Sequence, residues 1–240
     1  MNDASKPRSA LIPALIGGVA GSLITLALAI AVLPDALSTR IVRDGMLANP
    51  GILNEAAEAL RDQQFKPALD ANRAAIEKPF ATSWKGSANP DVTLVEFFDY
   101  ACPYCKTSNP DIERLVKEDK GLRVVYRELP ILGPNSVAAA RLSLAASKAG
   151  RFNAFHDALW AAGRPADATL AKAAAAAGIP ATLANDAEVE AELKRNFQLA
   201  GQLGATGTPL FIVGDRVINT AVGYDGLKEA IAQARAKKTG

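Results

Sequence analysis

The stretch "DVTLVEFFDYACPYCKTSNPDIERL", residues 91–115, decides the fold of this chain. Its first ten residues are rich in β-branched and aromatic side chains, which predicts a strand over 91–100. The polar and charged residues that follow predict a helix that begins near the cysteines and continues through Pro110. Cys102 and Cys105, the only cysteines among 240 residues, therefore lie where a strand passes into a helix.

The segments that follow continue an alternation of strands and helices. "LRVVYRELP", residues 122–130, predicts a second strand, and the Ala-rich stretch from 135 to about 203 predicts several helices. "PLFIVG" and "RVINT" predict a hairpin around Gly214 and Asp215, and "YDGLKEAIAQARAKK" predicts a closing helix. We expect an α/β layered fold with a helical insertion in its middle.

The composition narrows the functional classes. With 49% hydrophobic and 22% charged residues, the chain resembles an ordinary folded protein. A formal charge of +2 gives no broad basic surface, so we expect no nucleic-acid partner. Two cysteines are too few for a disulfide-built scaffold. A zinc site needs about four ligands. The chain offers two thiols and one histidine, His156, so we predict no metal and no cofactor.

The amino terminus predicts passage through a membrane. Lys6 and Arg8 precede residues 11–33, which contain no charged side chain. At about 1.5 Å per helical residue, a stretch of this length spans the roughly 30 Å hydrocarbon core of a bilayer. We expect a short cytoplasmic leader over 1–10 and an uncleaved anchor over 11–33. The alternative is a signal peptide cleaved near "ALAIA", residues 27–31, and in either case the rest of the chain crosses the membrane.

A helical connector is predicted between this segment and the main domain, over 34–80. Asn49 and Pro50 resemble a helix cap and a first-turn proline. A second helix is predicted over "FKPALDANRAAIEK", residues 65–78, and the main domain is expected over 81–240.

Within the connector, Leu53, Ala57 and Leu60 fall on one face of the predicted helix. Two interpretations of this apolar strip remain open. The connector is either a stalk for the main domain or a segment through which copies of the chain form a homo-oligomer.

The two cysteines lie at the predicted amino terminus of a helix. The unpaired N–H groups and the positive dipole end of a helix stabilise a nearby thiolate, and thiol pKa values there fall to roughly 3.5–7. We therefore predict that Cys102 is an exposed nucleophile with a lowered pKa. Cys105, about one turn further on, is expected to be less exposed and to act as the resolving thiol. Pro103 suits the first helical turn, where its missing N–H costs nothing.

Alternation along the predicted strand places five residues on one face: Val92, Leu94, Glu96, Phe98 and Tyr100. A carboxylate among such neighbours should be partly buried with a raised pKa. Glu96 is then a candidate to accept and return the proton of Cys105. The alternatives are that Glu96 pairs with a basic group such as Arg127 or faces solvent. Asp99 lies on the other face and is expected to accept a hydrogen bond near the turn.

Four stretches carry a resemblance to a known family: "VTLVEFFDYACPYC", "VVYRELPILGPNS", "RFNAFHDALW" and "GATGTPLFIVG". Together they resemble the DsbA-like thiol-disulfide oxidoreductases, which have a thioredoxin fold. The resemblance covers about residues 83–236, with the redox motif and the later loop in the expected order. It implies that the helical stretch over about 135–203 is the helical domain that family members carry inside the thioredoxin fold.

The resemblance also implies roles for individual residues. Glu96 matches the buried acidic residue of the family by its offset from the first cysteine. Thr208 and Pro209 match the family's cis-proline loop, so Pro209 would pack beside Cys102 and the Thr208 backbone would pair with an extended substrate. An ordinary proline at the entry of a strand is the alternative for Pro209.

Two positions bear on the direction of electron flow. The DsbA oxidases commonly have histidine inside the Cys-x-x-Cys loop, where this chain has Tyr104. A Cys-Pro-Tyr-Cys loop also occurs in glutaredoxins and in some periplasmic isomerase-type proteins, so the direction stays open. His156 falls in the predicted helical insertion, and we interpret it as a packing or surface residue.

The expected function is thiol-disulfide exchange with unfolded or misfolded secreted proteins, in the periplasm, by a single-pass protein of the inner membrane. The family resemblance implies a quinone-linked membrane protein as the oxidant. One alternative is an oligomeric isomerase or reductase that a thiol reductant keeps reduced. Another is a tethered chaperone or assembly factor that does not need the thiols.

Overall fold

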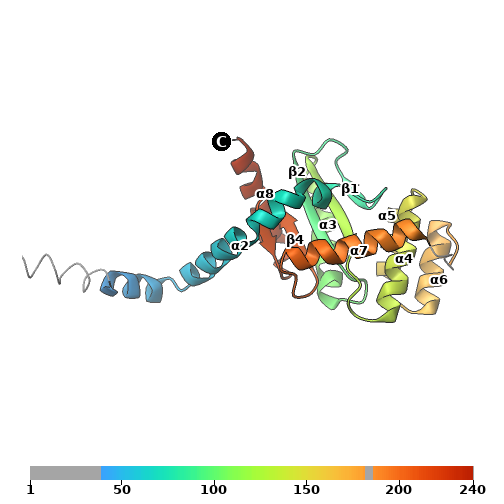
Figure 1. Cartoon of the computed structure of the whole chain (residues 1–240), viewed down its shortest axis with the longest axis horizontal. Coiled ribbons are helices and arrows are strands. Elements are labelled where there is room, and N and C mark those ends of the chain that lie inside the picture. Colours follow the sequence, from blue (N-terminus) through green and yellow to red (C-terminus); the bar gives the residue numbers. More distant parts are fainter. Residues whose placement is uncertain (1–38, 182–185, 240) are drawn as a thin grey trace, which may run out of the picture. The chain divides into compact units, whose positions relative to one another are not determined.

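The computed structural model describes residues 39–181 and 186–239 (Figure 1). The chain divides between Ala59 and Leu60 into two compact units, and each is described by itself.

The amino-terminal unit contributes helical residues 39–48 and the beginning of α2, Gly51–Glu77. This helix starts directly after Asn49 and Pro50, where the sequence predicted a helix start. The predicted anchor over 11–33 lies outside the described residues. Among the helices that the structure describes, none is long and apolar enough to cross a membrane.

The second unit is built on a five-stranded sheet with the order β1-β3-β2-β4-β5. Its strands are β1 Trp84–Gly86, β2 Val92–Phe98, β3 Leu122–Glu128, β4 Leu210–Val213 and β5 Arg216–Ile218. The central strands β2 and β3 are parallel, and the other three pairs are antiparallel. The strands predicted on either side of the thiol helix and the late hairpin are confirmed. The sequence did not predict β1, because three residues are too few to show a period.

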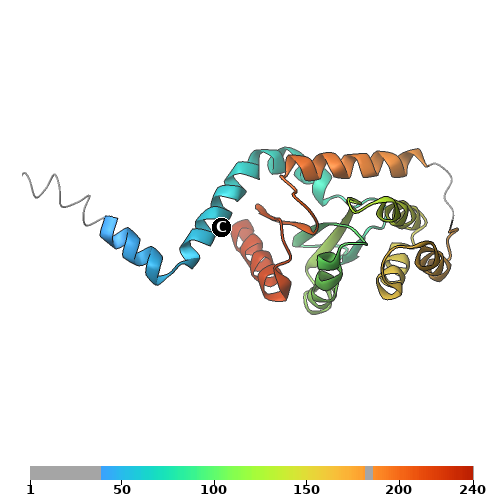
Figure 2. The same cartoon turned by 90° about the horizontal axis from the view of Figure 1, so that it is seen from below.

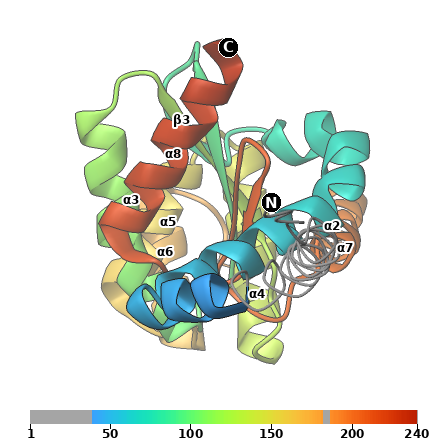
Figure 3. The same ribbon diagram turned by 90° about the vertical axis from the view of Figure 1, so that its left-hand side faces the viewer.

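Helices cover both faces of this sheet, as Figures 2 and 3 show. One face carries α3 Pro103–Glu118 and α8 Gly223–Thr239, and the other carries α7 Ala187–Gln202 and the later part of α2. The alternation of β2 matches these layers. Leu94 and Phe98 belong to the core on the α3 side, whereas Val95 and Phe97 belong to the core on the α7 side.

The helical insertion lies between β3 and β4 in the chain. It consists of α4 Pro134–Lys148, α5 Phe152–Ala162 and α6 Asp167–Ala177, and α7 then leads back to the sheet. Small residues on these helices allow close packing, and α4 meets α7 through Leu144 and Leu193. The predicted α/β fold with a helical insertion at about 135–203 is confirmed.

The prediction of a separate helix over 65–78 is wrong, because α2 runs without a break through Pro67. A proline inside a helix costs about 3 kcal/mol. Leu69 and Ile76, both fully buried under the sheet, contribute about 1.5–3 kcal/mol each. Tertiary burial therefore outweighs the local cost of the proline.

The compact unit also begins earlier than the predicted boundary at residue 81, because it includes α2 from Leu60 onward. Arg127 of β3 holds the end of this helix: its Nε donates to Ile76 O at 2.8 Å and its Nη2 to Lys78 O at 2.7 Å. Side chains of α2 complete the core on one face of the sheet, so this half of the helix is part of the main domain.

A close contact joins α2 to the loop that follows α7. Gly204 has a φ of +67°, and a Cβ atom placed there would lie 2.1 Å from Cζ of Phe65. Glycine is therefore required at this position for two reasons, the left-handed backbone and the ring that occupies the side-chain space.

We expect Gly204→Ala to lower the free energy of unfolding by about 2–4 kcal/mol, because it combines overpacking with an unfavourable backbone conformation. Gly201→Ala is the matched control, since a Cβ there meets nothing within 4 Å and α7 is already helical. The control should raise stability by at most about 1 kcal/mol. Urea denaturation of both variants measures the difference, and equal effects would contradict the assigned contact.

Candidate active site

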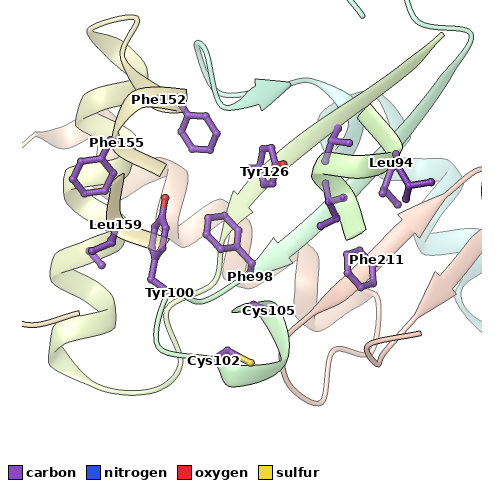
Figure 4. Close-up of a cluster of buried hydrophobic side chains, with 14 of the residues drawn as sticks. Leu94, Phe98, Tyr100, Cys102, Cys105, Tyr126, Phe152, Phe155, Leu159 and Phe211 are labelled. Carbon is purple, nitrogen blue, oxygen red and sulfur yellow. The ribbon is translucent and has the colours of Figure 1, made fainter. Parts of the chain in front are cut away.

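The two cysteines occupy the junction of β2 and α3. Cys102 is the N-cap residue of α3, with φ −76° and ψ 121°, and Pro103 follows in the first turn. The Cys102 N–H donates to Asp99 O at 2.9 Å, which closes the turn that leads out of the strand. Figure 4 shows both cysteines in the turn at the end of β2, with Cys105 the nearer to Phe98, and both thiols are free.

The environment of Cys102 favours the thiolate. A hydrogen bond from the Cys105 thiol is the largest cause that lowers the pKa of Cys102, to about 5, while desolvation opposes it. The side chain of Thr208 and the backbone N–H groups of Cys105 and Tyr104 lower the pKa further. A free cysteine titrates near pH 8.5, so Cys102 is ionised at neutral pH.

Cys102 is nevertheless more enclosed than the sequence predicted. We expected an exposed nucleophile, but this residue is only 4% exposed. Its Sγ lies 3.2 Å from the carbonyl oxygen of Thr208, so the loop before β4 covers it. Tyr104, in contrast, is 65% exposed at the mouth of the site. The order of exposure is as predicted, since Cys105 is completely buried.

Cys105 is held in its protonated form. Its hydrogen bond to Cys102 raises its pKa far above the usual value, and burial and the nearby charge of Glu96 add to this effect. The two thiols of the pair therefore differ strongly in acidity. One is a thiolate at neutral pH, and the other keeps its proton.

Glu96 lies buried on the face of β2 that carries Leu94 and Phe98, as the alternation predicted. Burial raises the pKa of Glu96 to about 8, and the negative charge of Cys102 is the second cause. The alternative pairing with Arg127 is wrong, because the neighbouring strand directs Arg127 to Glu192, with Nη1 donating to Oε1 at 2.9 Å. The solvent-facing alternative is also wrong, since Glu96 is 3% exposed.

The loop before β4 completes the site. The Thr208–Pro209 peptide bond is cis, as the family resemblance implied. Thr208 touches Cys102 through its carbonyl oxygen and influences its acidity through its side chain. The structure thus brings together the cysteines, Glu96 and this loop from three separate segments.

Asp99 is the hydrogen-bond acceptor that the sequence predicted near the turn. Its Oδ1 accepts from Ala101 N at 2.8 Å, and its Oδ2 accepts from the N–H groups of Ile131 and Leu132, both at 2.9 Å. These bonds hold the loop after β3 beside the thiol turn. Ile131 and Leu132 are 43% and 49% exposed, and the sequence did not single them out.

His156 is a buried residue of α5, in agreement with the packing interpretation. Its ring contacts Tyr100 at 3.0 Å, which lies in the thiol turn, and Trp160 at 3.0 Å. Burial lowers the pKa of His156 well below its usual range, so the ring is neutral. Within the described ranges, no group of three or more potential metal ligands comes together.

Known proteins share this architecture. A family model described as a DSBA-like thioredoxin domain matches residues 93–232. The crystal structure of a thioredoxin-like oxidoreductase from Silicibacter pomeroyi DSS-3 is 37% identical, with a TM-score of 0.64. The match covers 69% of this chain and 98% of that one. A linker-deletion mutant of ScsC from Proteus mirabilis is 29% identical with a TM-score of 0.67, over 86% of this chain and 97% of that one.

Curated relatives are matched over shorter stretches. Disulfide bond formation protein D of Bacillus subtilis is 29% identical over 164 residues, which cover 61% of this chain and 73% of that protein. An 88-residue stretch is 36% identical to Na(+)/H(+) antiporter NhaA 3 of Salinispora tropica and covers 35% of this chain. The match spans only 14% of the length of the antiporter.

The five-stranded sheet, its helical insertion and the Cys-x-x-Cys pair at the start of α3 define a thiol-disulfide oxidoreductase with a thioredoxin-like fold. The chain belongs to the DSBA-like thioredoxin domain family, whose model matches more than half of its residues.

The acidity difference within the pair predicts which thiol attacks. In the reduced protein, the thiolate absorbance of Cys102 should titrate near pH 5, well below the ordinary value of about 8.5. Cys105→Ala should accumulate mixed disulfides with client proteins, because the resolving thiol is missing. Accumulation in Cys102→Ala instead would reverse the two roles. Non-reducing gel electrophoresis distinguishes these results.

Glu96→Gln should stabilise the protein in a defined pH window. The carboxyl of Glu96 titrates at 4.5 when exposed and near 8 in the folded protein. Between these pH values the Glu96 carboxyl is ionised in the unfolded chain and protonated in the folded one, so the wild-type protein loses stability as the pH rises. The variant should therefore be more stable by about 3 kcal/mol at pH 7 and no more stable below pH 4.

Desolvation is the larger cause of this shift, so most of the difference should persist in the oxidised protein. The exposed residue Glu55 supplies a control, because Glu55→Gln makes the same chemical change without removing a buried carboxyl. Denaturant unfolding between pH 4 and pH 8 makes the comparison. If the free energy of unfolding of Glu96→Gln changed with pH in the same way as that of the wild type, Glu96 would not be a buried, neutral carboxyl.

Proposed function

We propose that this oxidoreductase is anchored in the inner membrane and exchanges disulfides with secreted or periplasmic proteins. The observation that carries the proposal is the Cys102–Cys105 pair, with one thiol stabilised as a thiolate and the other held protonated. The uncharged stretch over 11–33, preceded by Lys6 and Arg8, supports the anchor. Extraction of cell membranes with alkaline carbonate tests it, because an anchored chain stays in the pellet.

The acidity of Cys102 favours the role of disulfide donor. Interactions that stabilise the thiolate stabilise the reduced form of the pair, so they make the oxidised form a stronger oxidant. The pKa of Cys102, about 5, lies between the values of about 3.5 and 7 that bracket strong oxidants and reductants of this fold.

The exchange proceeds in two displacements. A thiolate of the client attacks Sγ of Cys102, the Cys102–Cys105 bond breaks, and Cys105 leaves and takes up a proton. Glu96, protonated at neutral pH, supplies that proton from its buried position. A second client thiolate then attacks the client sulfur of the mixed disulfide and releases Cys102 as a thiolate. Two electrons pass from the client to the pair, and a quinone-linked membrane protein would remove them.

The surroundings of the site suit an unfolded client. Tyr104, Ile131 and Leu132 present exposed apolar surface around the thiol turn. The hydrogen bonds of Asp99 fix two of these residues next to it. An extended polypeptide with apolar side chains would gain contacts there while its cysteine approaches Cys102.

An oligomeric isomerase is the second candidate, and the apolar strip of α2 favours it. Leu53 and Leu60 are 55% and 67% exposed. The preceding helix adds to this surface, where Val42, Met46 and Leu47 are also exposed and line a groove together with Leu53. Association of several chains through this surface would bring several reduced sites around one misfolded client. The similarity to ScsC covers 86% of this chain, against 71% for the catalytic domain of ScsC alone, so it extends beyond that domain.

Redox equilibrium and oligomeric state separate the two candidates. The full chain, equilibrated with a glutathione buffer, should show a potential toward about −120 mV if it donates disulfides and toward about −270 mV if it reduces them. Leu53→Lys with Leu60→Lys should leave dithiol oxidation intact. If the isomerase candidate is correct, light scattering should show loss of oligomers and isomerisation should fall. Retained client folding after replacement of both cysteines by alanine would instead indicate a chaperone.

A further inference from the structure

His156 connects the helical insertion to the thiol turn. Its imidazole is completely buried in α5. Nδ1 lies 3.0 Å from the hydroxyl of Tyr100, and Nε2 lies 3.0 Å from the indole nitrogen of Trp160. Oδ1 of Asn109 in α3 lies 3.3 Å from the same Nε2. One ring thus contacts the turn before Cys102, the helix after it and its own helix.

The partners determine the direction of these hydrogen bonds. An indole N–H can only donate, so Nε2 of His156 accepts from Trp160. The neutral ring then carries its proton on Nδ1 and donates it to the Tyr100 hydroxyl. In this tautomer Nε2 has no proton, so Oδ1 of Asn109 contacts Nε2 without accepting a hydrogen bond from it. The Tyr100 hydroxyl is left free to donate to Oγ of Ser143 at 3.1 Å. The chain of donors runs from Trp160 through His156 to the thiol turn.

These contacts lie on both sides of the reactive pair. Tyr100 is two residues before Cys102, and Asn109 is one helical turn after Cys105. Figure 4 shows the Tyr100 side chain extending from the thiol turn toward Phe155 and Leu159 of α5. His156 therefore holds the thiol turn through its hydrogen bond to Tyr100 and touches the first part of α3 at Asn109.

The acidity of Cys102 depends on where this turn holds the sulfur. The backbone N–H groups of Tyr104 and Cys105 and the side chain of Thr208 contribute to it, and such bonds weaken steeply as geometry worsens. A shift of Tyr100 moves the peptide units that follow it in the chain. A residue that holds Tyr100 in place therefore also keeps the Cys102 sulfur at hydrogen-bonding distance from its donors.

We propose that His156 is a positioning residue for the reactive thiol, acting through its Nδ1–H bond to Tyr100. The inference rests on the proposed role of Cys102 as the nucleophile. A histidine that merely filled the core would need no partner in the thiol turn. Here its single N–H group is bonded to the hydroxyl of Tyr100, a residue of that turn, and the rest of the ring packs on aromatic neighbours such as Phe98 and Phe152.

Two substitutions distinguish the contributions of the two ring nitrogens of His156. His156→Asn places an amide near the position of Nδ1 and keeps a donor for Tyr100. His156→Gln places an amide near the position of Nε2 and keeps an acceptor for Trp160. Asparagine is one methylene shorter than glutamine, so His156→Asn leaves the larger cavity and should lower stability more than His156→Gln. Only the glutamine variant should affect the thiol.

The readout is the pKa of Cys102 in the reduced full chain, from thiolate absorbance. His156→Gln should raise it by about half a unit, as expected for one lost hydrogen bond. His156→Asn should leave it within about 0.2 units of wild type. In the equilibrium of the oxidised protein and two glutathione with the reduced protein and glutathione disulfide, His156→Gln should lower the equilibrium constant about threefold.

Tyr100→Phe removes the other partner of the bond and keeps the packed ring. It should produce the same shift as His156→Gln, and the double variant should show no further shift, since both substitutions break one interaction. Tyr100→Phe also keeps the test open if a His156 variant does not fold.

If His156→Asn and His156→Gln shifted the pKa of Cys102 equally, or if Tyr100→Phe did not shift it, His156 would be a packing residue only. Additive shifts in the double variant would also overturn the proposal. An ordinary thiol pKa in the wild-type protein would be a different result. It would refute the proposed nucleophile before any variant of His156 is compared.

Discussion

The stabilisation of one negative charge, on the sulfur of Cys102, is the interaction on which the rest of the site depends. The first peptide groups of α3 and the Thr208 side chain act on this sulfur only if the turn after β2 holds it in place. Asp99 fixes that turn by accepting three backbone hydrogen bonds, two of them from the loop after β3. Parallel pairing of β2 with β3 brings these two strand ends to the same edge of the sheet. The sheet thus sets the acidity of a thiol that lies outside it.

The face of the sheet that leads to the cysteines also carries an unusual set of buried polar groups. Glu96 and Glu128 are both buried there, and burial raises the pKa of each. The Tyr126 hydroxyl and Glu128 Oε1 have no hydrogen-bond partner among the described residues. Such groups lower stability. Their concentration beside a reactive pair fits the general pattern in which functional sites depart from the local rules of folding.

The later half of α2 belongs to the catalytic unit, although the sequence predicted that it was part of a connector. Leu69 and Ile76 place this half of the helix in the core. Arg127 donates to a carbonyl group in the last turn of α2 and, through Nη1, to Glu192 of α7. The contact of Phe65 with Gly204 extends this connection to the loop that ends at Thr208 and Pro209. The half of α2 from Leu60 onward is therefore part of the structure that supports the active site.

The sequence by itself determined the strand that ends at the cysteines, the helix that begins with them and the inward face that holds Glu96. These follow from short-range causes, namely side-chain alternation and helix-end chemistry, which act over a few residues. Tertiary structure alone decided that Cys102 is enclosed, that Arg127 binds Glu192 and that α2 continues through Pro67 into the core. It also decided that His156 reaches Tyr100, 56 positions away in the chain. No local pattern encodes such contacts, because they depend on how the helical insertion and the sheet meet.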